Sequence, residues 1–142
     1  MDIANGITSA ADEGVDVINT SFGANEPSQT VRTAASYALT RGVVMVAAGG
    51  NAGPTGVVRY PAGYPGVLGI SAVGENGTLA SFSTRGPHID LSGPGTDIVS
   101  TTPGGGWGYD SGTSMATAHV AGVAASSTGR AAGSDRPPWP IV

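Results

Sequence analysis

The 142-residue sequence contains no cysteine and no lysine, and these two absences exclude several classes of function. Without cysteine, the chain can form neither a disulfide bond nor a cysteine-ligated metal site. The six basic residues are all arginines spread along the chain, and the net charge is −4, so no basic patch is available for a nucleic-acid backbone. No apolar run approaches the roughly 18 to 20 residues of a membrane span, and no basic amphipathic helix indicates binding to a membrane surface. The sequence therefore predicts neither a nucleic acid nor a membrane as a partner.

The composition is that of a packed chain with many tight turns. Hydrophobic residues make up 39% of the sequence and charged residues only 11%, which suits a folded domain rather than a disordered one. The 24 glycines follow no three-residue period, so they indicate tight loops rather than a collagen-like repeat. The first residues have neither a basic region nor a long apolar core, so no signal peptide is predicted within this chain.

Helix-like and strand-like segments alternate along the sequence. Apolar residues recur at helical spacing in residues 3–13 and 28–41, and Ser28 is a plausible N-cap for the second of these helices. Runs of β-branched and apolar residues predict strands at 15–22, 43–48 and 67–73. A strand, a helix and a strand within about 35 residues form a βαβ unit with parallel strands. The remaining expectations are short strands and turns over 79–102, a flexible glycine tip at 104–106 and a final helix over 113–126.

A serine at the expected start of the final helix is the strongest candidate for chemistry. Ser114 follows Gly112 and Thr113, and an apolar helix begins there. The first N–H groups of a helix lack intrahelical acceptors and the helix dipole is positive at that end, so an oxyanion developing near Ser114 would be stabilised. For this segment alone, helix capping by the serine is the simpler interpretation. The segment also differs from the G-x-S-x-G nucleophile elbow, because Ala116 stands in place of the second glycine.

Other segments of the chain favour a catalytic role for Ser114 over simple helix capping. The serine segment continues into His119-Val120-Ala121-Gly122, and five more segments precede it: Asp16–Gly23, Val44–Gly53, Tyr60–Ala62, Phe82–Pro87 and Gly93–Ile98. In their order and spacing over residues 1 to about 126, these six segments closely resemble the subtilisin-like serine proteases. One such match would be weakly specific, whereas six in the same order are highly specific.

The resemblance implies a fold and a division of the chain. It implies an α/β fold in which a parallel sheet lies between layers of helices, the three-layer subtilisin-like fold. That fold would be incomplete, because the family's N-terminal strands and C-terminal helices are missing. Residues 1–126 would form a partial peptidase domain, and residues 127–142, which include a proline cluster, are expected to be a disordered or aberrant tail.

The resemblance also implies roles for individual residues. Ser114 would be the nucleophile that forms the acyl-enzyme, and Asn51 would donate its side-chain amide to the oxyanion together with the Ser114 N–H. Ser21–Gly23 would pair with the substrate backbone as an added strand. Ala47–Gly49 would line a pocket suited to apolar or aromatic side chains, and Tyr60-Pro61 resembles a cis peptide of the family. The residues predicted to contact substrate are Ser21, Phe22, Gly23, Ala47, Ala48, Gly49, Gly50 and Thr113.

The family triad also needs an aspartate and a histidine, and this chain supplies neither. In the family they lie upstream, in D-[ST]-G and H-G-T motifs. His119 lies five residues after Ser114, about 140° away around the helix, and is expected to be structural. His88 is expected in a loop or at the surface. Asp110 begins an Asp-Ser-Gly sequence but directly precedes the nucleophile, and Asp16 falls on the substrate strand, so neither matches the family's acid.

The predicted function is serine-type endopeptidase activity on polypeptides for the whole protein, with little or none for this chain alone. An upstream segment would supply the missing aspartate and histidine. The alternatives are a non-catalytic peptide-binding fragment and one half of a split protease. No cofactor is expected to be required; the carbonyls near Ala62 and Tyr64 could hold a structural calcium weakly, but no carboxylate cluster supports one and no metal site is assigned. The whole protein is expected to be secreted.

Overall fold

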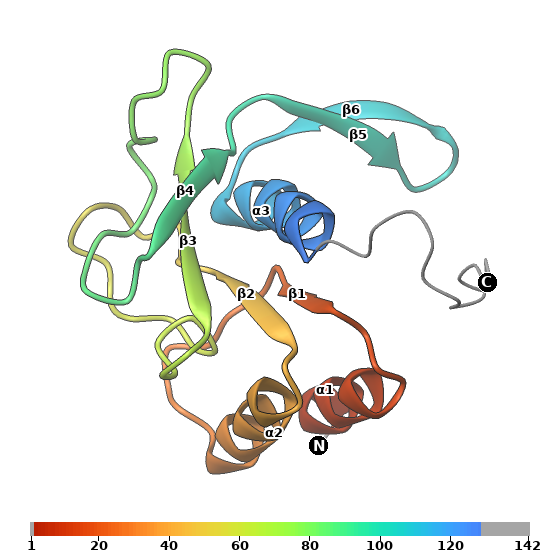
Figure 1. Ribbon diagram of the computed structural model, residues 1–142. Helices are drawn as coiled ribbons and strands as arrows, with labels where there is room; N and C mark the ends of the chain where they lie inside the picture. Colours follow the sequence, from red (N-terminus) through yellow and green to blue (C-terminus); the bar gives the residue numbers. More distant parts are fainter. Residues whose placement is uncertain (1, 129–142) are drawn as a thin grey trace.

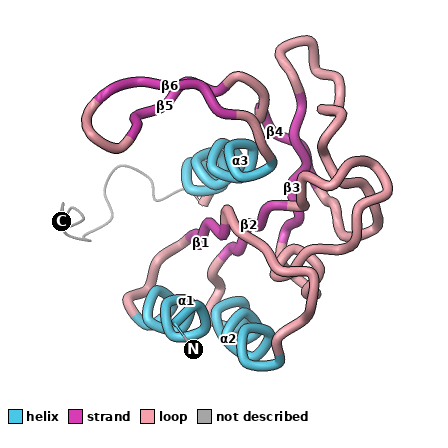
Figure 2. Tube along the Cα trace, turned by 180° about the vertical axis from the view of Figure 1, so that it is seen from behind, coloured by secondary structure: helices cyan, strands magenta, loops and turns pink. Residues whose placement is uncertain are grey.

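Residues 2–128 are described by the computed structural model, and they form a parallel sheet with helices on both faces (Figure 1, Figure 2). The four-stranded sheet has the order β1-β2-β3-β4, and each neighbouring pair is parallel. Helices α1 and α2 cover one face, and α3 covers the other. The predicted three-layer α/β fold is confirmed. The elements are α1 (Asp2–Asp12), β1 (Val17–Thr20), α2 (Gln29–Thr40), β2 (Val44–Ala48), β3 (Leu68–Val73), β4 (Leu91–Pro94) and α3 (Thr113–Ser127).

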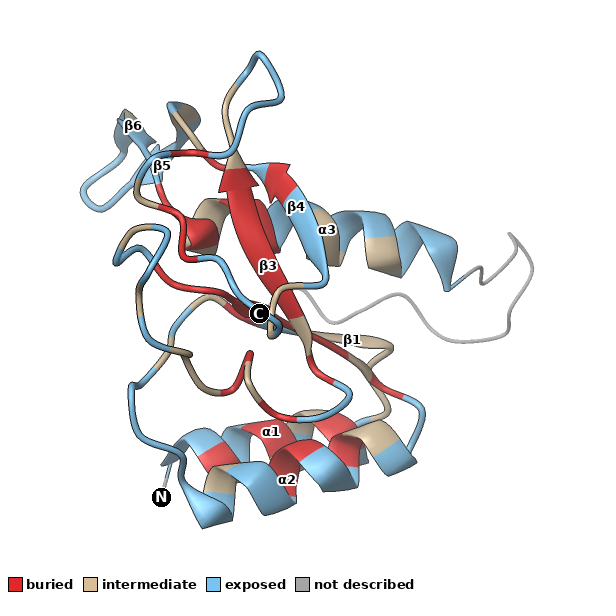
Figure 3. Ribbon diagram, turned by 90° about the vertical axis from the view of Figure 1, so that its left-hand side faces the viewer, coloured by how far each residue is buried: buried red, intermediate tan, exposed pale blue. Residues whose placement is uncertain are grey.

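Strand β2 supplies side chains to both layers of the core. Met45 and Ala47 pack in the cluster formed with α1 and α2, whereas Val46 packs with Ile70 of β3 and Ala116 of α3. Successive side chains of a strand point to opposite faces, so a strand covered on both sides must be apolar throughout. Figure 3 shows the same pattern, with β3 buried along most of its length and the outer sides of the helices exposed. The continuous apolar run predicted this strand correctly.

Most element boundaries agree with the sequence to within one or two residues. Ser28 is the N-cap of α2, and its Oγ accepts the Val31 N–H at 3.4 Å. The strand predicted over 15–22 is wrong in length, because β1 pairs with β2 only over Val17–Thr20. The chain leaves the sheet at Ser21, whose hydroxyl donates instead to a carbonyl of α3.

An antiparallel hairpin follows the sheet and was only half predicted. It consists of β5 (Ile98–Thr102) and β6 (Gly106–Asp110). The flexible tip expected at 104–106 is a turn in which Gly104 and Gly105 have φ of 88° and 81°, and residue 106 already belongs to β6. Strand β6 was missed because its sequence, Gly-Trp-Gly-Tyr-Asp, holds two glycines, which strands usually avoid.

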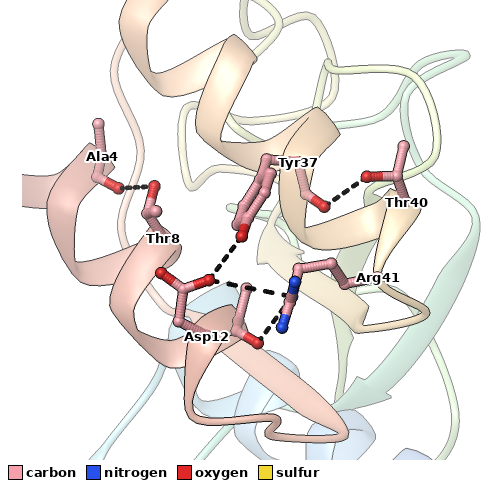
Figure 4. A network of polar contacts seen from close by, with 7 residues as sticks. Ala4, Thr8, Asp12, Tyr37, Thr40 and Arg41 are labelled. Carbon is pink, nitrogen blue, oxygen red and sulfur yellow. Dashed lines mark hydrogen bonds and ion pairs between the residues drawn. The ribbon is translucent and has the colours of Figure 1, made fainter.

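The C-terminal end of α1 is joined to that of α2 by a small polar cluster, shown in Figure 4. The Tyr37 hydroxyl donates to the Asp12 carboxylate at 2.5 Å. Arg41 Nε donates to the Ala11 carbonyl at 3.2 Å, and the guanidinium lies 5.4 Å from the centre of the Tyr37 ring. These contacts fix the two helices on the same face of the sheet.

Within residues 2–128, no helix has the length and apolar character needed to cross a membrane. Helix α3 continues to Ser127, one residue beyond the predicted final helix. The remainder of the predicted tail, residues 129–142, lies outside the described residues.

Candidate active site

Ser114 is the second residue of α3, and the start of this helix faces the ends of β1 and β2. The N-cap, Gly112, has an extended backbone, and its N–H donates to the Gly95 carbonyl at 2.8 Å. A Cβ added at Gly112 would lie 3.1 Å from the amide nitrogen of Asn51. A glycine there lets the start of α3 approach Asn51 closely. As a first-turn residue, Ser114 has a backbone N–H without an intrahelical acceptor.

The side-chain amide of Asn51 has a fixed orientation. The Thr113 N–H donates to Asn51 Oδ1 at 2.9 Å, and the Thr113 hydroxyl donates to the same oxygen at 2.8 Å. A backbone N–H can only donate, so the atom that it reaches must be the amide oxygen. The NH₂ group of Asn51 is therefore the end turned away from Thr113. The buried Thr113 hydroxyl also accepts the Gly50 N–H at 3.2 Å, which satisfies it as donor and as acceptor.

The hydroxyl of Ser114 bonds to the chain that leaves β1. It donates to the Ser21 carbonyl at 2.7 Å, and the Ser21 hydroxyl donates back to the Ser114 carbonyl at 2.9 Å. Residues Ser21, Asn51, Thr113 and Ser114, which the sequence predicted as site residues, thus come together at one end of the sheet. Their catalytic and binding roles stay predictions.

The predicted substrate-pairing segment already has a partner inside the chain. Arg59 Nη2 donates to the Gly23 carbonyl at 3.1 Å, and Arg59 Nη1 bonds the side chain of Asn25. The neighbouring Ala24 exchanges two backbone hydrogen bonds with Tyr60, each 2.9 Å long. Nothing in the sequence indicated the Arg59 contact, because Arg59 lies in a long loop without periodicity. The Tyr60-Pro61 bond is cis, as the resemblance suggested.

Phe22 borders an apolar cavity of about 260 Å³, which we call the Phe22 cavity. Its lining residues come from α1, the segment after β1, the start of α2 and the loop before β3: Ile3, Phe22, Gly23, Ala24, Glu26, Ser28, Val31, Tyr60, Pro61 and Tyr64. The Tyr64 hydroxyl closes one side of it by donating to the Ser28 carbonyl at 2.9 Å. The sequence analysis did not predict this cavity, because its walls come from four separate segments.

The four residues at the end of β2 that were predicted to contact substrate are all buried: Ala47, Ala48, Gly49 and Gly50. A Cβ added at Gly49 would lie 2.3 Å from Ile89 Cδ1 and 2.9 Å from the Ile70 carbonyl oxygen. Only glycine fits there, because the loop that contains Ile89 packs directly on the chain after β2. Their role as the wall of a specificity pocket stays a prediction.

Neither histidine of the chain bonds to Ser114. His119 Nδ1 donates to the Met115 carbonyl of the preceding helical turn at 3.0 Å. His88 Nε2 donates to the Gly49 carbonyl at 3.3 Å, since a carbonyl can only accept. The loop position expected for His88 is confirmed: it lies half-buried in a turn, and its Nδ1 is buried without a hydrogen-bond partner.

Neither of the two aspartates that were considered as triad acids is placed to serve as one. The Asp110 carboxylate accepts the N–H of the next residue, Ser111, at 2.7 Å. Asp16 precedes β1, whereas Ser21 follows the other end of that strand. Among residues 2–128, no three His, Cys, Asp or Glu residues gather as a metal site would require. The Tyr64 carbonyl, one of the ligands suggested for calcium, already accepts a hydrogen bond from the Val67 N–H at 3.1 Å.

Comparison with known proteins gives a consistent result. The model of the subtilase family, Peptidase_S8, matches residues 1–136. The thermostable alkaline protease of Halalkalibacterium halodurans is 47% identical over 123 residues, which are 87% of this chain and 34% of that protein. Subtilisin E of Bacillus subtilis (strain 168) is 45% identical over 126 residues, 87% of this chain and 33% of its own length.

Solved structures agree with the sequence relatives. The patellamide maturation protease PatA has a TM-score of 0.82 at 37% identity, covering 87% of this chain and 48% of the PatA chain. The structure titled Sphericase has a TM-score of 0.79 at 36% identity, with 87% and 47% covered. The chain therefore spans about a third of the length of these curated relatives and about half of the length of the solved chains.

Proposed function

The chain belongs to the subtilase family, and from that membership we propose that the whole protein hydrolyses peptide bonds in polypeptides with Ser114 as nucleophile. The Ser114 oxygen would attack the scissile carbonyl while a base takes its proton. The oxyanion would accept hydrogen bonds from the Asn51 NH₂ group and the Ser114 N–H. The protonated base would then give its proton to the leaving amine, and water would hydrolyse the acyl-enzyme by the same route.

One observation carries this proposal: the Thr113 N–H and hydroxyl both hold the Asn51 carbonyl oxygen, at 2.9 and 2.8 Å. They leave the NH₂ group as the only end of the amide that can meet an oxyanion. A donor that is oriented before the substrate arrives costs no reorganisation when charge develops. A serine that merely capped the helix would not require an amide held beside it in this way.

The base and its orienting carboxylate would come from a segment outside this chain. Two features of the described residues support an upstream segment as the partner. Strand β1 is an edge of a parallel sheet, a kind of sheet that is normally covered. Helix α3 is rich in apolar residues on all sides, yet Val123 on it is 66% exposed. A further segment that packs on β1 and α3 would bury both.

The test mixes this chain with a segment that carries the upstream part of the protein and follows cleavage of a chromogenic peptide. We expect hydrolysis by the mixture, little or none by either part alone, and loss of hydrolysis in the Ser114→Ala mixture. A mixture that forms but does not cleave the peptide would refute the proposed activity. Cleavage by the chain alone at protease-like rates, lost on Ser114→Ala, would refute the need for an outside base.

The Phe22 cavity favours a second candidate, which is peptide binding without cleavage. An apolar cavity next to the segment Phe22-Gly23 could hold an apolar side chain of an extended peptide. Calorimetric titration of the chain with a peptide that contains a large apolar residue distinguishes the candidates. Binding by the chain, with no cleavage after the upstream segment is added, would establish the binding module in place of the protease.

We also propose that catalysis needs no organic or redox cofactor, because the proton transfers above involve only side chains and water. Any calcium would be structural, so removing it with a chelator would lower the midpoint of thermal unfolding without abolishing hydrolysis. A secreted location of the whole protein is likewise proposed from its subtilisin relatives. Cell fractionation that recovered the protein only from the cytoplasm would contradict it.

A further inference from the structure

We propose that Thr84 is a positioning residue for Asn51, an inference that rests on the function proposed above. Thr84 is fully buried in the segment that connects β3 to β4, far from Asn51 in sequence. Its N–H donates to the Gly50 carbonyl at 2.9 Å, and its Oγ1 accepts the Ala52 N–H at 3.3 Å. Gly50 and Ala52 are the two neighbours of Asn51. One buried residue therefore holds the backbone on both sides of the oxyanion donor.

The Thr84 hydroxyl occupies a closely fitted space between two glycines. A Cβ added at Gly50 would lie 3.1 Å from Thr84 Oγ1, and one added at Gly56 would lie 2.7 Å from it. The backbone at Gly56 thus approaches the hydroxyl more closely than a side chain there would permit, and the backbone at Gly50 approaches it almost as closely. The Ala52 N–H donates to this oxygen. Removing the Thr84 hydroxyl would therefore leave a backbone donor without its acceptor.

The loop that carries Asn51 needs such an external support. Gly50 has a φ of 113°, which side-chain-bearing residues rarely adopt, so local sterics do little to fix this turn. Thr113 fixes the side-chain oxygen of Asn51 from the helix side. Thr84 fixes the backbone that bears this side chain through its bonds to Gly50 and Ala52. The direction of the NH₂ group depends on both anchors, and a displacement of about 1 Å is enough to weaken an oriented donor.

This role predicts a specific kinetic signature. An oxyanion donor interacts with charge that develops only in the transition state, so a misplaced donor lowers kcat and leaves substrate binding largely unchanged. A Thr84 that acted only on folding would lower stability without changing the kcat of the folded enzyme. As a positioning residue, Thr84 would act through Asn51 and would not touch the substrate.

Ser83 provides a matched control one residue away. It is also fully buried, and its hydroxyl accepts the Ala72 N–H at 3.0 Å. Ser83→Ala therefore removes the same kind of bond as Thr84→Val, but from strand β3 instead of the Asn51 loop. Thr84→Ser keeps the hydroxyl and serves as the rescue variant. Thr84→Ala, which adds no atom beside the two glycines, replaces Thr84→Val where the latter fails to fold.

The first measurement uses the full chain and needs no activity. Nuclear magnetic resonance follows the Asn51 side-chain NH₂ signals and the hydrogen exchange of the Ala52 amide. We expect Thr84→Val to shift the NH₂ signals and to speed Ala52 exchange roughly tenfold or more, as loss of a hydrogen bond implies. Thr84→Ser and Ser83→Ala should leave both close to wild type.

The second measurement uses the chain mixed with its upstream segment. We expect Thr84→Val to lower kcat roughly tenfold to a hundredfold with KM within about twofold, and Thr84→Ser to restore kcat. Unmoved Asn51 signals in Thr84→Val, or a kcat loss in Ser83→Ala equal to that of Thr84→Val, would overturn the positioning role. If the wild-type mixture cleaves nothing, the proposed function fails, and the Asn51 signals alone decide whether Thr84 positions the amide.

Discussion

The hydroxyls of Ser114 and Ser21 each donate to the other residue's carbonyl, at 2.7 and 2.9 Å. These two bonds join the end of β1 to the first turn of α3 across 93 residues of sequence. A hydroxyl has one proton, so Ser114 cannot donate to the Ser21 carbonyl and to a base at the same time. Under the proposed function, a base supplied from outside the chain would have to replace this carbonyl as the acceptor. The reciprocal pair is the resting arrangement of the candidate nucleophile.

The Ser21 hydroxyl is expected to stabilise this junction. Ser21→Ala removes the bond to the Ser114 carbonyl and an exposed contact in which the Ser21 hydroxyl accepts from Asn19 Nδ2 at 3.0 Å, but keeps the Ser21 carbonyl that accepts the Ser114 hydroxyl. We expect the free energy of unfolding to fall by about 1 kcal/mol, the usual net contribution of one hydrogen bond. Urea denaturation of the full chain measures it, with Ser21→Thr as the control that retains a hydroxyl. An unchanged urea midpoint in Ser21→Ala would show that the bond adds nothing to stability.

Thr113→Val tests the anchor of the Asn51 amide. Valine keeps the shape of the side chain but loses the hydroxyl, so the Gly50 N–H loses its acceptor and Asn51 Oδ1 keeps only one of its two donors. We expect a loss of about 1–3 kcal/mol in stability, because a buried donor is left unsatisfied. In the mixture with the upstream segment, kcat should also fall. Thr113→Ser should retain both properties; equal losses in the serine variant would assign the effect to the methyl group.

Much of the fold could be predicted because its signals are local. The apolar run before Gly49 specifies a strand buried on both faces, and Ser28 specifies a helix start through its own side chain. Strand β6 was missed because its glycines conceal the alternation, and its pairing with β5 depends on a turn at Gly104 and Gly105. A local sequence pattern does not predict a strand whose formation depends on pairing with another strand.

The candidate site likewise has parts that could be predicted from the sequence and parts that could not. The segments around Asn51 and Ser114 could be identified from their sequence, but the bonds between Asn51 and Thr113 join positions 62 residues apart. No spacing rule reports such a contact. Thr84 lay within a segment that matched the family, yet its burial and its two bonds to the Asn51 loop appear only once the strands are in place. The Ser114–Ser21 pair was likewise not predictable, since the sequence suggested a substrate as the partner of Ser21.

The Tyr37–Asp12 contact predicts an effect at alkaline pH. The hydrogen bond to the Asp12 carboxylate, and then burial, raise the pKa of Tyr37 above its ordinary value of 10.0. The folded state thus retains the phenol proton when the unfolded state loses it. The stabilisation is fully present below about pH 10.0 and is lost as the pH rises through the raised pKa.

Ultraviolet titration of tyrosinate measures this pKa, and Asp12→Asn should bring it back toward the ordinary value, because a neutral amide oxygen accepts a weaker hydrogen bond than a carboxylate. The difference in unfolding free energy between wild type and Tyr37→Phe should shrink as the pH rises above about 10.0. A difference that is constant across this range would mean that the phenol proton does not contribute to stability. The remaining tyrosines are present in both proteins, so the comparison removes their contribution.

The Phe22 cavity predicts a preference for peptides with a large apolar residue. Phe22 is 45% exposed and forms one wall, so truncating it removes part of the apolar surface that such a residue would cover. We expect Phe22→Ala to weaken binding of a leucine-containing peptide by roughly tenfold, which corresponds to burial of about 50 to 60 Å². A peptide with alanine at that position should bind both proteins alike. Leu79→Ala is the matched control, because Leu79 is 40% exposed but is not among the lining residues. If Phe22→Ala weakened both peptides equally, Phe22 would act on the backbone or the fold, and the cavity would not select side chains.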